Sequence, residues 1–265
     1  MTNTELSHRY TSLRDIIQSL GPMAIAFSGG VDSTFLLQVA HDVFPGQVAA
    51  FFADSLVQPA GEKAAALEFA KKIGVPLQII DFNLLDEAEF IANSPERCYY
   101  CKKKIFSTFR KFSLKEGQVL ADGTNLDDLQ EVRPGFKACQ ELGVKSPLLE
   151  AGLTKADIRI LSRKFGLSTW NKPSASCLAT RIAEGHEITA SAISLVDRGE
   201  EWLHSQGFWG CRLRVRDKVC CIELSAGDIA RFSKTDKYSL ALEFMYSLGF
   251  QKVFLDLSER EGILA

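Results

Sequence analysis

The chain has 265 residues, of which 46% are hydrophobic, and a formal net charge of -2. This length suits one large domain or two modest ones around a packed core, and the balanced charge argues against a general binder of polyanions such as nucleic acids. The amino terminus lacks the features of a signal peptide, and the sequence contains no apolar run long enough to cross a bilayer. We therefore expect a cytoplasmic protein that acts on a small molecule, without a membrane or nucleic-acid partner.

The first half of the chain alternates segments with helical periodicity and segments with strand character. In chain order, the predicted elements are a helix at 9–20, a strand at 23–27, a helix through 35–40, a strand at 47–53, a helix at 59–72, a strand at 76–82, a helix opening at 96–104, a strand at 118–121 and a helix at 154–165. Strands that alternate with helices form a parallel sheet with helices on both faces. The sequence therefore predicts an α/β fold with a doubly wound parallel sheet.

Ser28, Gly29 and Gly30 interrupt the apolar pattern between the first strand and the helix that follows it. Glycines allow backbone N–H groups to close around a phosphate at a helix start. Ser33 adds a hydroxyl donor, and Asp32 adds a carboxylate suited to Mg²⁺. Neither the Walker pattern nor the dinucleotide fingerprint is present. We interpret this stretch as an ATP-binding loop; the alternative is a glycine turn capped by Asp or Ser.

Two further strands end in polar residues that would lie at the same edge of the sheet. Asp54 follows the strand at 47–53, and Asp122 and Gly123 follow the strand at 118–121. Ligands of parallel α/β sheets bind beyond the carboxyl ends of the strands. We expect these residues to line the ATP pocket, with a plain Asx turn at Asp122 as the alternative.

Three cysteines stand in settings that indicate chemistry. Cys98 and Cys101 are three residues apart at a helix start, and Cys177 lies in a loop without periodicity that also carries Arg181. The chain has seven cysteines, an odd number, and in a reducing compartment cysteines are more often thiols or metal ligands than disulfides. A thiolate is a competent nucleophile, and Lys172 and Arg181 would lower the pKa of Cys177 if they faced it.

The carboxyl-terminal part shows a different pattern, which predicts a small α+β domain. Its elements are a helix at 189–205, a hairpin of strands at 211–216 and 219–224, a helix at 240–248 and a strand at 252–257. We therefore expect two domains, at 1–184 and 185–265, the second serving substrate binding and oligomerisation. A homo-oligomer is expected.

Arginines occupy alternate positions of the first hairpin strand. Arg212, Arg214 and Arg216 would project from one face of the strand, and Leu213 and Val215 from the other. Guanidinium forks side by side suit a phosphate or a carboxylate. A solvated strand face is the alternative.

The loop at 28–33 resembles the Ser-Gly-Gly-x-Asp-Ser loop of the ATP pyrophosphatases, the PP-loop enzymes that split ATP between its α and β phosphates. The whole chain resembles one branch of that superfamily, the LarE family of ATP-dependent sulfur transferases. This narrower resemblance rests on further motifs, namely Tyr99-Tyr100-x-Lys102-Lys103, Arg133-Pro134-Gly135, Trp170-Asn171-Lys172 and the segment from Cys177 to Arg181.

The resemblance implies a reaction. The family uses ATP to adenylate a carboxylate of pyridinium-3,5-biscarboxylic acid mononucleotide, releases pyrophosphate and installs sulfur as a thiocarboxylate. The product leads to the nickel-pincer nucleotide cofactor of lactate racemase. The position that matches the family's sulfur-donating cysteine is Cys177, with Arg181 near the chemistry.

The resemblance also suggests how the mononucleotide is held. Arg212 and Arg214 are expected to bind it, and Glu200 is expected to be an acidic residue of the same site. The segment 225–232 departs from the family pattern, which leaves open whether it supplies an acidic partner such as Asp228.

The source of the sulfur has two interpretations. Cys98, Cys101 and Cys177 form a set of three thiolates, and structural zinc normally takes four ligands. We favour a [4Fe–4S] cluster on this set, with one iron free to carry a sulfide, which would make the enzyme catalytic. Direct transfer of the Cys177 sulfur would instead leave dehydroalanine after one turnover. A disulfide or zinc at Cys98 and Cys101 is a further alternative.

Three other functions compete with sulfur transfer to a mononucleotide. Thiolation or lysidine formation on tRNA uses the same adenylation chemistry but should come with a basic surface or an RNA-binding appendage. NAD or GMP synthesis leaves the cysteines unexplained. A nucleotide-binding module without activity, with zinc at the cysteine pair, is the non-enzymatic alternative.

Overall fold

The computed structural model describes residues 3–59, 61–129, 134–173, 176–233 and 237–258. The chain divides into two compact units, the first made of residues 1–55, 61–82 and 95–172, and the second of residues 56–60, 83–94 and 173–265. The second unit therefore includes the stretch 173–184 and two earlier segments. The domain boundary expected after residue 184 stays a prediction.

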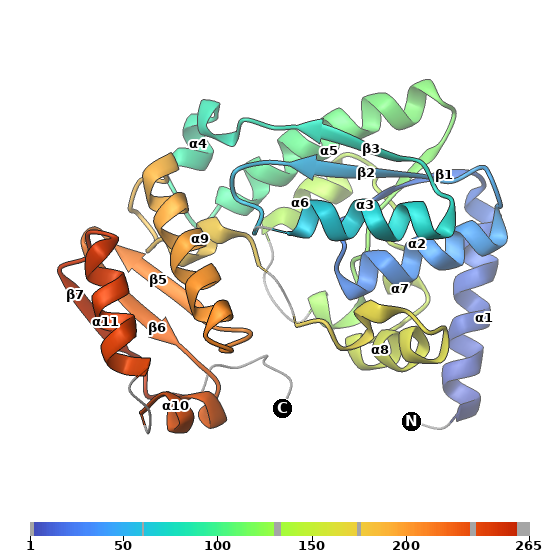
Figure 1. Cartoon of the computed structure of the whole chain (residues 1–265). Helices are drawn as coiled ribbons and strands as arrows, with labels where there is room; N and C mark the ends of the chain where they lie inside the picture. Colours follow the sequence, from blue (N-terminus) through green and yellow to red (C-terminus); the bar gives the residue numbers. More distant parts are fainter. Residues whose placement is uncertain (1–2, 60, 130–133, 174–175, 234–236, 259–265) are drawn as a thin grey trace. The chain divides into compact units, whose positions relative to one another are not determined.

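The first unit is built on a parallel sheet of four strands in the order β3-β2-β1-β4 (Figure 1). The strands are β1 (Met23–Ala26), β2 (Ala49–Asp54), β3 (Leu77–Asp81) and β4 (Val119–Ala121). Ile25 of β1 pairs with Ala50 of β2 on one side and with Ala121 of β4 on the other. The strand order reverses between β1 and β4, and ligands of such sheets bind beyond the strand ends at this switch point.

Helices pack on both faces of this sheet. They are α1 (Asn3–Leu20), α2 (Val31–Val43), α3 (Glu62–Ile73), α5 (Arg97–Lys115), α6 (Pro134–Glu141), α7 (Pro147–Glu150) and α8 (Lys155–Lys164), with the 3₁₀ turns η2 (Leu126–Leu129) and η3 (Ser168–Asn171). Phe52 of β2 joins the main core with α1, α2 and α8, whereas its neighbour Phe51 contacts Phe109 and Phe112 of α5. Successive strand residues point to opposite faces, so the predicted doubly wound α/β fold is confirmed.

Local signals set the helix ends of this unit. Gly74 ends α3 in the left-handed conformation with φ of 72°, which glycine adopts without steric cost. Thr154 and Asp157 form the predicted capping box, in which each side chain accepts from the backbone of the other. Helices α6 and α7, of 8 and 4 residues, were not predicted, because elements this short show little periodicity.

The second unit contains a three-stranded sheet in the order β5-β6-β7. Its elements are η1 (Leu84–Asp86), α4 (Ala88–Ile91), η4 (Leu178–Arg181), α9 (Ala190–Ser205), β5 (Arg212–Arg216), β6 (Val219–Glu223), α10 (Ala226–Ser233), α11 (Lys237–Ser247) and β7 (Lys252–Leu255). Strands β5 and β6 are antiparallel, and β6 and β7 are parallel. The predicted α+β pattern is confirmed, with α10 as an additional helix.

Asn93 explains why a segment from the first half of the chain belongs to the second unit. Its buried side-chain amide donates to the carbonyls of Ala183, at 2.8 Å, and His186, at 2.9 Å. These bonds fix the segment that follows η4 and so help to position that turn.

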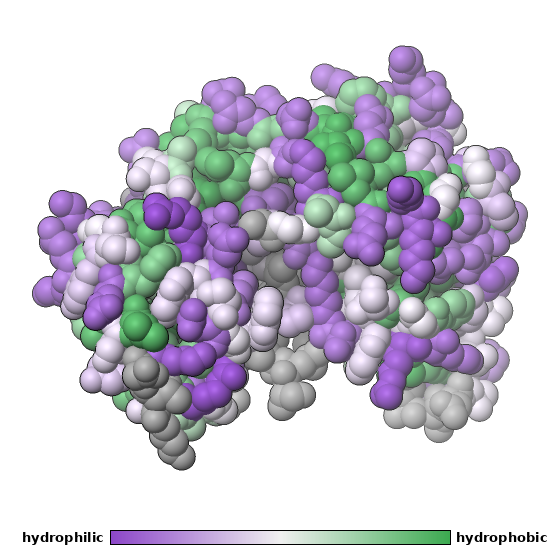
Figure 2. Space-filling model, in the orientation of Figure 1, coloured by the Kyte–Doolittle hydropathy of each residue, from purple (hydrophilic) through white to green (hydrophobic). Residues whose placement is uncertain are grey.

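None of the described helices has both the length and the apolar character needed to cross a membrane. The face drawn in Figure 2 is covered by hydrophilic residues with smaller hydrophobic areas between them.

Candidate active site

The loop between β1 and α2 folds tightly on itself. Gly29 has φ of 72°, so a residue with a side chain would be strained there. The Ser28 and Ser33 hydroxyls lie 3.1 Å apart, and the Gly30 carbonyl accepts the first helical hydrogen bond, from the Thr34 amide at 3.0 Å. Gly30 is the N-cap residue of α2 and has no side chain to cap the first amides. The helix start therefore suits an anionic group.

Asp32, in the first turn of α2, is the acidic group of this loop. Its Oδ2 accepts from the ammonium of Lys155, whereas its buried Oδ1 has no hydrogen-bond partner among the described residues. Burial raises the pKa of the Asp32 carboxyl, and Lys155 opposes that rise. A carboxylate with one unsatisfied oxygen fits the oxygen ligands that Mg²⁺ requires.

Lys172 reaches the same loop from the end of η3. Its ammonium donates to the Gly29 carbonyl at 3.1 Å and to the Glu62 carboxylate at 2.7 Å. Arg159 of α8 donates to the carbonyls of Trp170 and Lys172, at 2.7 and 2.9 Å. Lys172 therefore ties the loop to α3, a contact that no sequence motif indicated.

The turn after β4 lies directly against the start of α2. Asp122 forms an Asx turn, in which its carboxylate accepts from the Thr124 amide at 3.1 Å, and it also accepts from the Ser146 hydroxyl at 2.7 Å. A Cβ at Gly123 would lie 2.9 Å from the Ser33 backbone nitrogen. Glycine is thus required for the turn to approach the loop this closely. Direct contact of either residue with ATP stays a prediction.

Asp54 ends β2 at the same edge of the sheet. It pairs with Lys63 of α3, and the Asp54 side chain is 26% exposed. An expected role in the ATP pocket stays a prediction.

The cysteine pair lies in the first turns of α5, where Cys98 is exposed and Cys101 half-buried. Helix α6 packs closely on these turns, because a Cβ at Gly135 would lie 2.8 Å from Lys102 Cδ and 3.3 Å from the Cys98 carbonyl oxygen. Cys139 of α6 is buried, and burial raises its pKa to about 12. Arg133, which belongs to the motif before α6, lies outside the described residues.

Cys98 and Cys101 belong to the first unit and Cys177 to the second. Within either unit, the described His, Cys, Asp and Glu side chains form no group of three that could hold a metal ion. The proposed set of three thiolates would combine residues of both units, and it stays a prediction.

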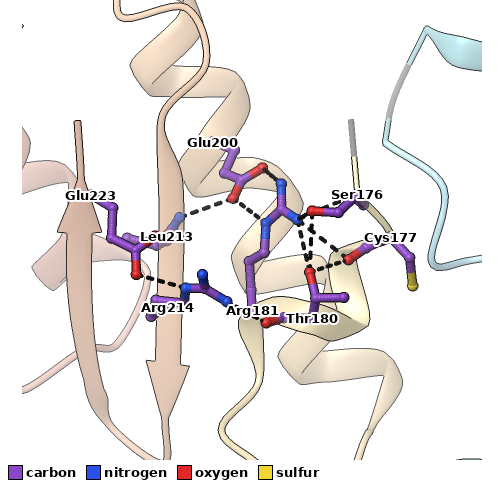
Figure 3. Close-up of polar contacts among 8 residues, drawn as sticks. All are labelled: Ser176, Cys177, Thr180, Arg181, Glu200, Leu213, Arg214 and Glu223. Carbon is purple, nitrogen blue, oxygen red and sulfur yellow. Dashed lines mark hydrogen bonds and ion pairs between the residues drawn. The ribbon is translucent and has the colours of Figure 1, made fainter. Parts of the chain in front are cut away.

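In the second unit, Arg181 organises the turn that carries Cys177 (Figure 3). Arg181 and Glu200 are both 5% exposed, and the guanidinium donates to the two Glu200 carboxylate oxygens at 2.8 and 3.1 Å. Its Nη1 donates to the Ser176 carbonyl at 3.0 Å and to the Thr180 hydroxyl at 2.9 Å. The Cys177 thiol points away from the guanidinium, and a catalytic role for Arg181 beside Cys177 stays a prediction.

The arginines of β5 alternate as predicted, because Leu213 and Val215 are buried while Arg216 is exposed and Arg212 and Arg214 are half-buried. Arg214 Nε donates to Glu223 at 2.7 Å, and its Nη1 donates to the Thr180 carbonyl at 2.6 Å. Arg214 therefore contacts the Cys177 turn as well as its own sheet.

Two acidic residues that were suggested as parts of the substrate site accept hydrogen bonds from other residues of the protein. Glu200 accepts from the Leu213 amide at 2.9 Å in addition to Arg181. Asp228, in α10, accepts from Arg231 at 2.8 Å. Substrate contacts by either residue stay predictions.

The structure adds Lys155, Glu62 and Asn93 to the residues that surround these sites. Lys155 directly follows a helix cap and Glu62 begins a helix. Charged residues are ordinary at such positions, so the sequence pattern did not mark either one as a site residue. Their approach to the loop arises from the packing of α8 and α3.

Known proteins resemble the chain over nearly its full length, although no family model matches it. It is 34% identical over 253 residues to an uncharacterized protein of Synechocystis sp., which covers 95% of this chain and 94% of that protein. It is 32% identical over 255 residues to the pyridinium-3,5-bisthiocarboxylic acid mononucleotide synthase of Lactiplantibacillus plantarum, covering 95% and 91%. A shorter match, 26% identical over 155 residues, covers 54% of the chain and 49% of a glutamine-hydrolyzing GMP synthase polypeptide of Methanocaldococcus jannaschii.

Proposed function

The chain belongs to the pyridinium-3,5-bisthiocarboxylic acid mononucleotide synthase family, the LarE family, and we propose that it is an ATP-dependent sulfur transferase. Its substrate in this proposal is pyridinium-3,5-biscarboxylic acid mononucleotide. One carboxylate attacks the α phosphorus of ATP, pyrophosphate leaves, and a sulfur nucleophile then displaces AMP to give a thiocarboxylate. The observation that carries the proposal is the loop at 28–33, where a glycine-built helix start meets a carboxylate with an unsatisfied oxygen.

The first unit supplies the residues for the nucleotide step. The backbone at Gly29 and Gly30 and the hydroxyls of Ser28 and Ser33 would hold phosphate oxygens at the start of α2. Asp32 would hold Mg²⁺, which when bound neutralises charge on the leaving pyrophosphate. Gly123 packs closely against the backbone of Ser33 and so supports the loop. The chain's own contribution is positioning and charge stabilisation.

The second unit supplies the candidate sulfur residue. A Cys177 thiolate would attack the adenylated carboxyl carbon, form a carbon–sulfur bond and release AMP with the electron pair of the broken carbon–oxygen bond. Loss of the cysteine α proton would then break the cysteine Cβ–S bond, leaving sulfur on the substrate and dehydroalanine in the chain. This route consumes the protein.

A cluster offers a route that spares the cysteine, and it is the route we favour. Cys98, Cys101 and Cys177 are thiolate donors of the kind that hold [4Fe–4S] clusters, and a bound cluster would supply sulfide as the sulfur nucleophile. Exposed Cys98 and half-buried Cys101 on adjoining turns of α5 are compatible with two of the ligands.

The products of ATP turnover test the nucleotide step. The purified protein, incubated with ATP, Mg²⁺ and the biscarboxylic acid mononucleotide, should form AMP and pyrophosphate, detected by anion-exchange chromatography. Asp32→Ala should remain folded by circular dichroism but lose about 10²- to 10³-fold in rate, the usual loss for one charge-stabilising group. Formation of ADP and phosphate would contradict the proposal.

The sulfur source is tested by iron and acid-labile sulfide analysis after anaerobic purification, followed by mass spectrometry of the chain after turnover. Iron and sulfide should be lost in Cys98→Ser and Cys101→Ser and kept in Cys139→Ser, whose buried thiol serves as the matched control. An active, iron-free protein in which Cys177 has become dehydroalanine would select the direct transfer instead.

A further inference from the structure

The ion pair between Lys155 and Asp32 joins the first turn of α8 to the ATP loop. The ammonium donates to Asp32 Oδ2, and the side chains are 29% and 19% exposed, so a ligand from solvent can reach both. Both residues belong to the first unit. The nucleotide step as described above gives Lys155 no role.

Lys155 satisfies only half of the Asp32 carboxylate. Oδ1 of Asp32 is buried, and among the described residues no group donates to it. A buried acceptor without a donor costs free energy. A divalent cation can bind both oxygens or bridge the unsatisfied one to a ligand, so it competes directly with the lysine for this carboxylate.

The backbone around Lys155 is held by hydrogen bonds that do not depend on the ion pair of its side chain. The Lys155 amide donates to Asp127 at 2.8 Å, and the adjoining capping box fixes the start of α8. Arg159, one turn later, is fixed by the two carbonyls of η3 and the residue after it. The Lys155 ammonium stands on a flexible four-carbon stem, so it can change partners without movement of the helix.

We propose that Lys155 exchanges one binding partner for another in the ATP loop. Its ammonium neutralises Asp32 when nucleotide is absent, and it binds the phosphates of the departing pyrophosphate when Asp32 binds Mg²⁺. Two cations at one carboxylate repel each other, and the ATP phosphates offer charged acceptors within the same loop. The lysine then stabilises charge that develops on pyrophosphate. This inference rests on the proposed binding of ATP by the loop.

The exchange predicts opposite effects of one substitution on two ligands. In Lys155→Met, Mg²⁺ alone no longer competes with an ammonium, so it should bind about tenfold more tightly than to the unaltered protein. ATP should bind about tenfold more weakly, because a phosphate contact is lost; one charge-assisted contact is of this order. Isothermal titration of the full-length chain with MgCl₂ alone, and separately with ATP in the presence of Mg²⁺, measures both.

Two further variants make the test specific. Asp32→Asn combined with Lys155→Met should abolish the gain in Mg²⁺ binding, because the competing carboxylate is gone. Lys164→Met, at the exposed end of the same helix, should leave both affinities unchanged. If Lys155→Met does not fold, Lys155→Gln removes the charge and keeps a hydrogen-bond donor.

An ion pair that merely stabilises the fold gives a different result. Lys155→Met would then lower the melting temperature and leave the affinity for Mg²⁺ alone unchanged, which would overturn the exchange. Absence of ATP binding by the unaltered protein would overturn the proposed function, while tighter Mg²⁺ binding by Lys155→Met would still support the Lys155–Asp32 competition.

Discussion

The two units differ in how far the hydrogen-bonding atoms of their central charged groups are satisfied by the protein. In the second unit, every guanidinium nitrogen of Arg181 donates to a protein acceptor, on Glu200 or on the Cys177 turn (Figure 3). In the first unit, Asp32 keeps a buried oxygen for which the described residues supply no donor, and its ion pair is partly exposed. A saturated network holds one geometry, whereas an unsaturated carboxylate has capacity left for a ligand.

This difference separates residues that hold the site in shape from residues that bind. From the sequence, Asp32 was expected to hold Mg²⁺, and the family resemblance placed Arg181 near the chemistry. The contacts favour a positioning role for Arg181, because its donors are engaged by the turn that carries Cys177. They favour a ligand-binding role for Asp32. Four predictions test this comparison, beginning with the change expected to have the largest effect.

Arg181→Met should cost about 3–5 kcal/mol of the free energy of unfolding, because it leaves Glu200 buried without a counterion. Urea unfolding followed by circular dichroism measures the loss. Arg216→Met, at the end of β5 and exposed, is the control and should be nearly neutral. Replacing both members of the pair, as in Arg181→Met with Glu200→Leu, should recover part of the stability. An Arg181→Met protein as stable as the control would show that the saturated network does not support the second unit.

Arg214→Ala should weaken binding of the mononucleotide by about 1.5–3 kcal/mol, the range for hydrogen bonds to a charged group. Arg214 has features of both a positioning residue and a ligand-binding residue, since it bonds Glu223 and Thr180 while its side chain stays 38% exposed. Equilibrium binding of the substrate without ATP measures the change, with Arg216→Ala as the control. Unchanged affinity would assign Arg214 to the support of the turn alone.

Gly123→Ala should destabilise the first unit by about 1–3 kcal/mol, as overpacking does, because the new Cβ would meet rigid backbone at Ser33. ATP binding should weaken as well, since the loop must shift. Gly227→Ala is the matched control: it lies in α10, and apart from its own helix no atom of the described residues lies within 4 Å of an added Cβ. Thermal unfolding with and without ATP compares them. Equal melting temperatures would show that the loop yields without cost.

The smallest effect concerns cysteine reactivity, which should follow burial. Burial raises the pKa values of Cys139 and Cys220 to about 12, so both thiols stay protonated at pH 8 and should resist iodoacetamide in the folded, metal-free protein. Exposed Cys98 should be alkylated first. Peptide mass spectrometry reads the order, and urea should bring the buried pair to the same rate. Early modification of Cys139 in the folded protein would contradict the close packing of α6 on α5.

The sequence alone determined most of the fold. Apolar periodicity located the four strands of the first sheet and the long helices, because burial forces these patterns on any chain that packs a doubly wound sheet. Glycine and capping signals located the ends of α3 and α8, since those preferences are local. Short helices such as α6, α7 and α10 were not predicted, because helices of one or two turns depend more on tertiary contacts than on a sequence pattern.

The sequence also determined the ATP loop, the candidate cysteines and the alternating arginines of β5, because each is a contiguous motif with its own chemistry. Only the tertiary structure decided which charges face one another. Asp32 and Lys155 are 123 positions apart, and Arg181 and Glu200 are 19 apart. A sequence pattern gives the faces of helices and strands but not the partner that packing brings to each face. That physical reason is why Lys155 was missed and why the ion pair of Arg181 with Glu200 was not predicted.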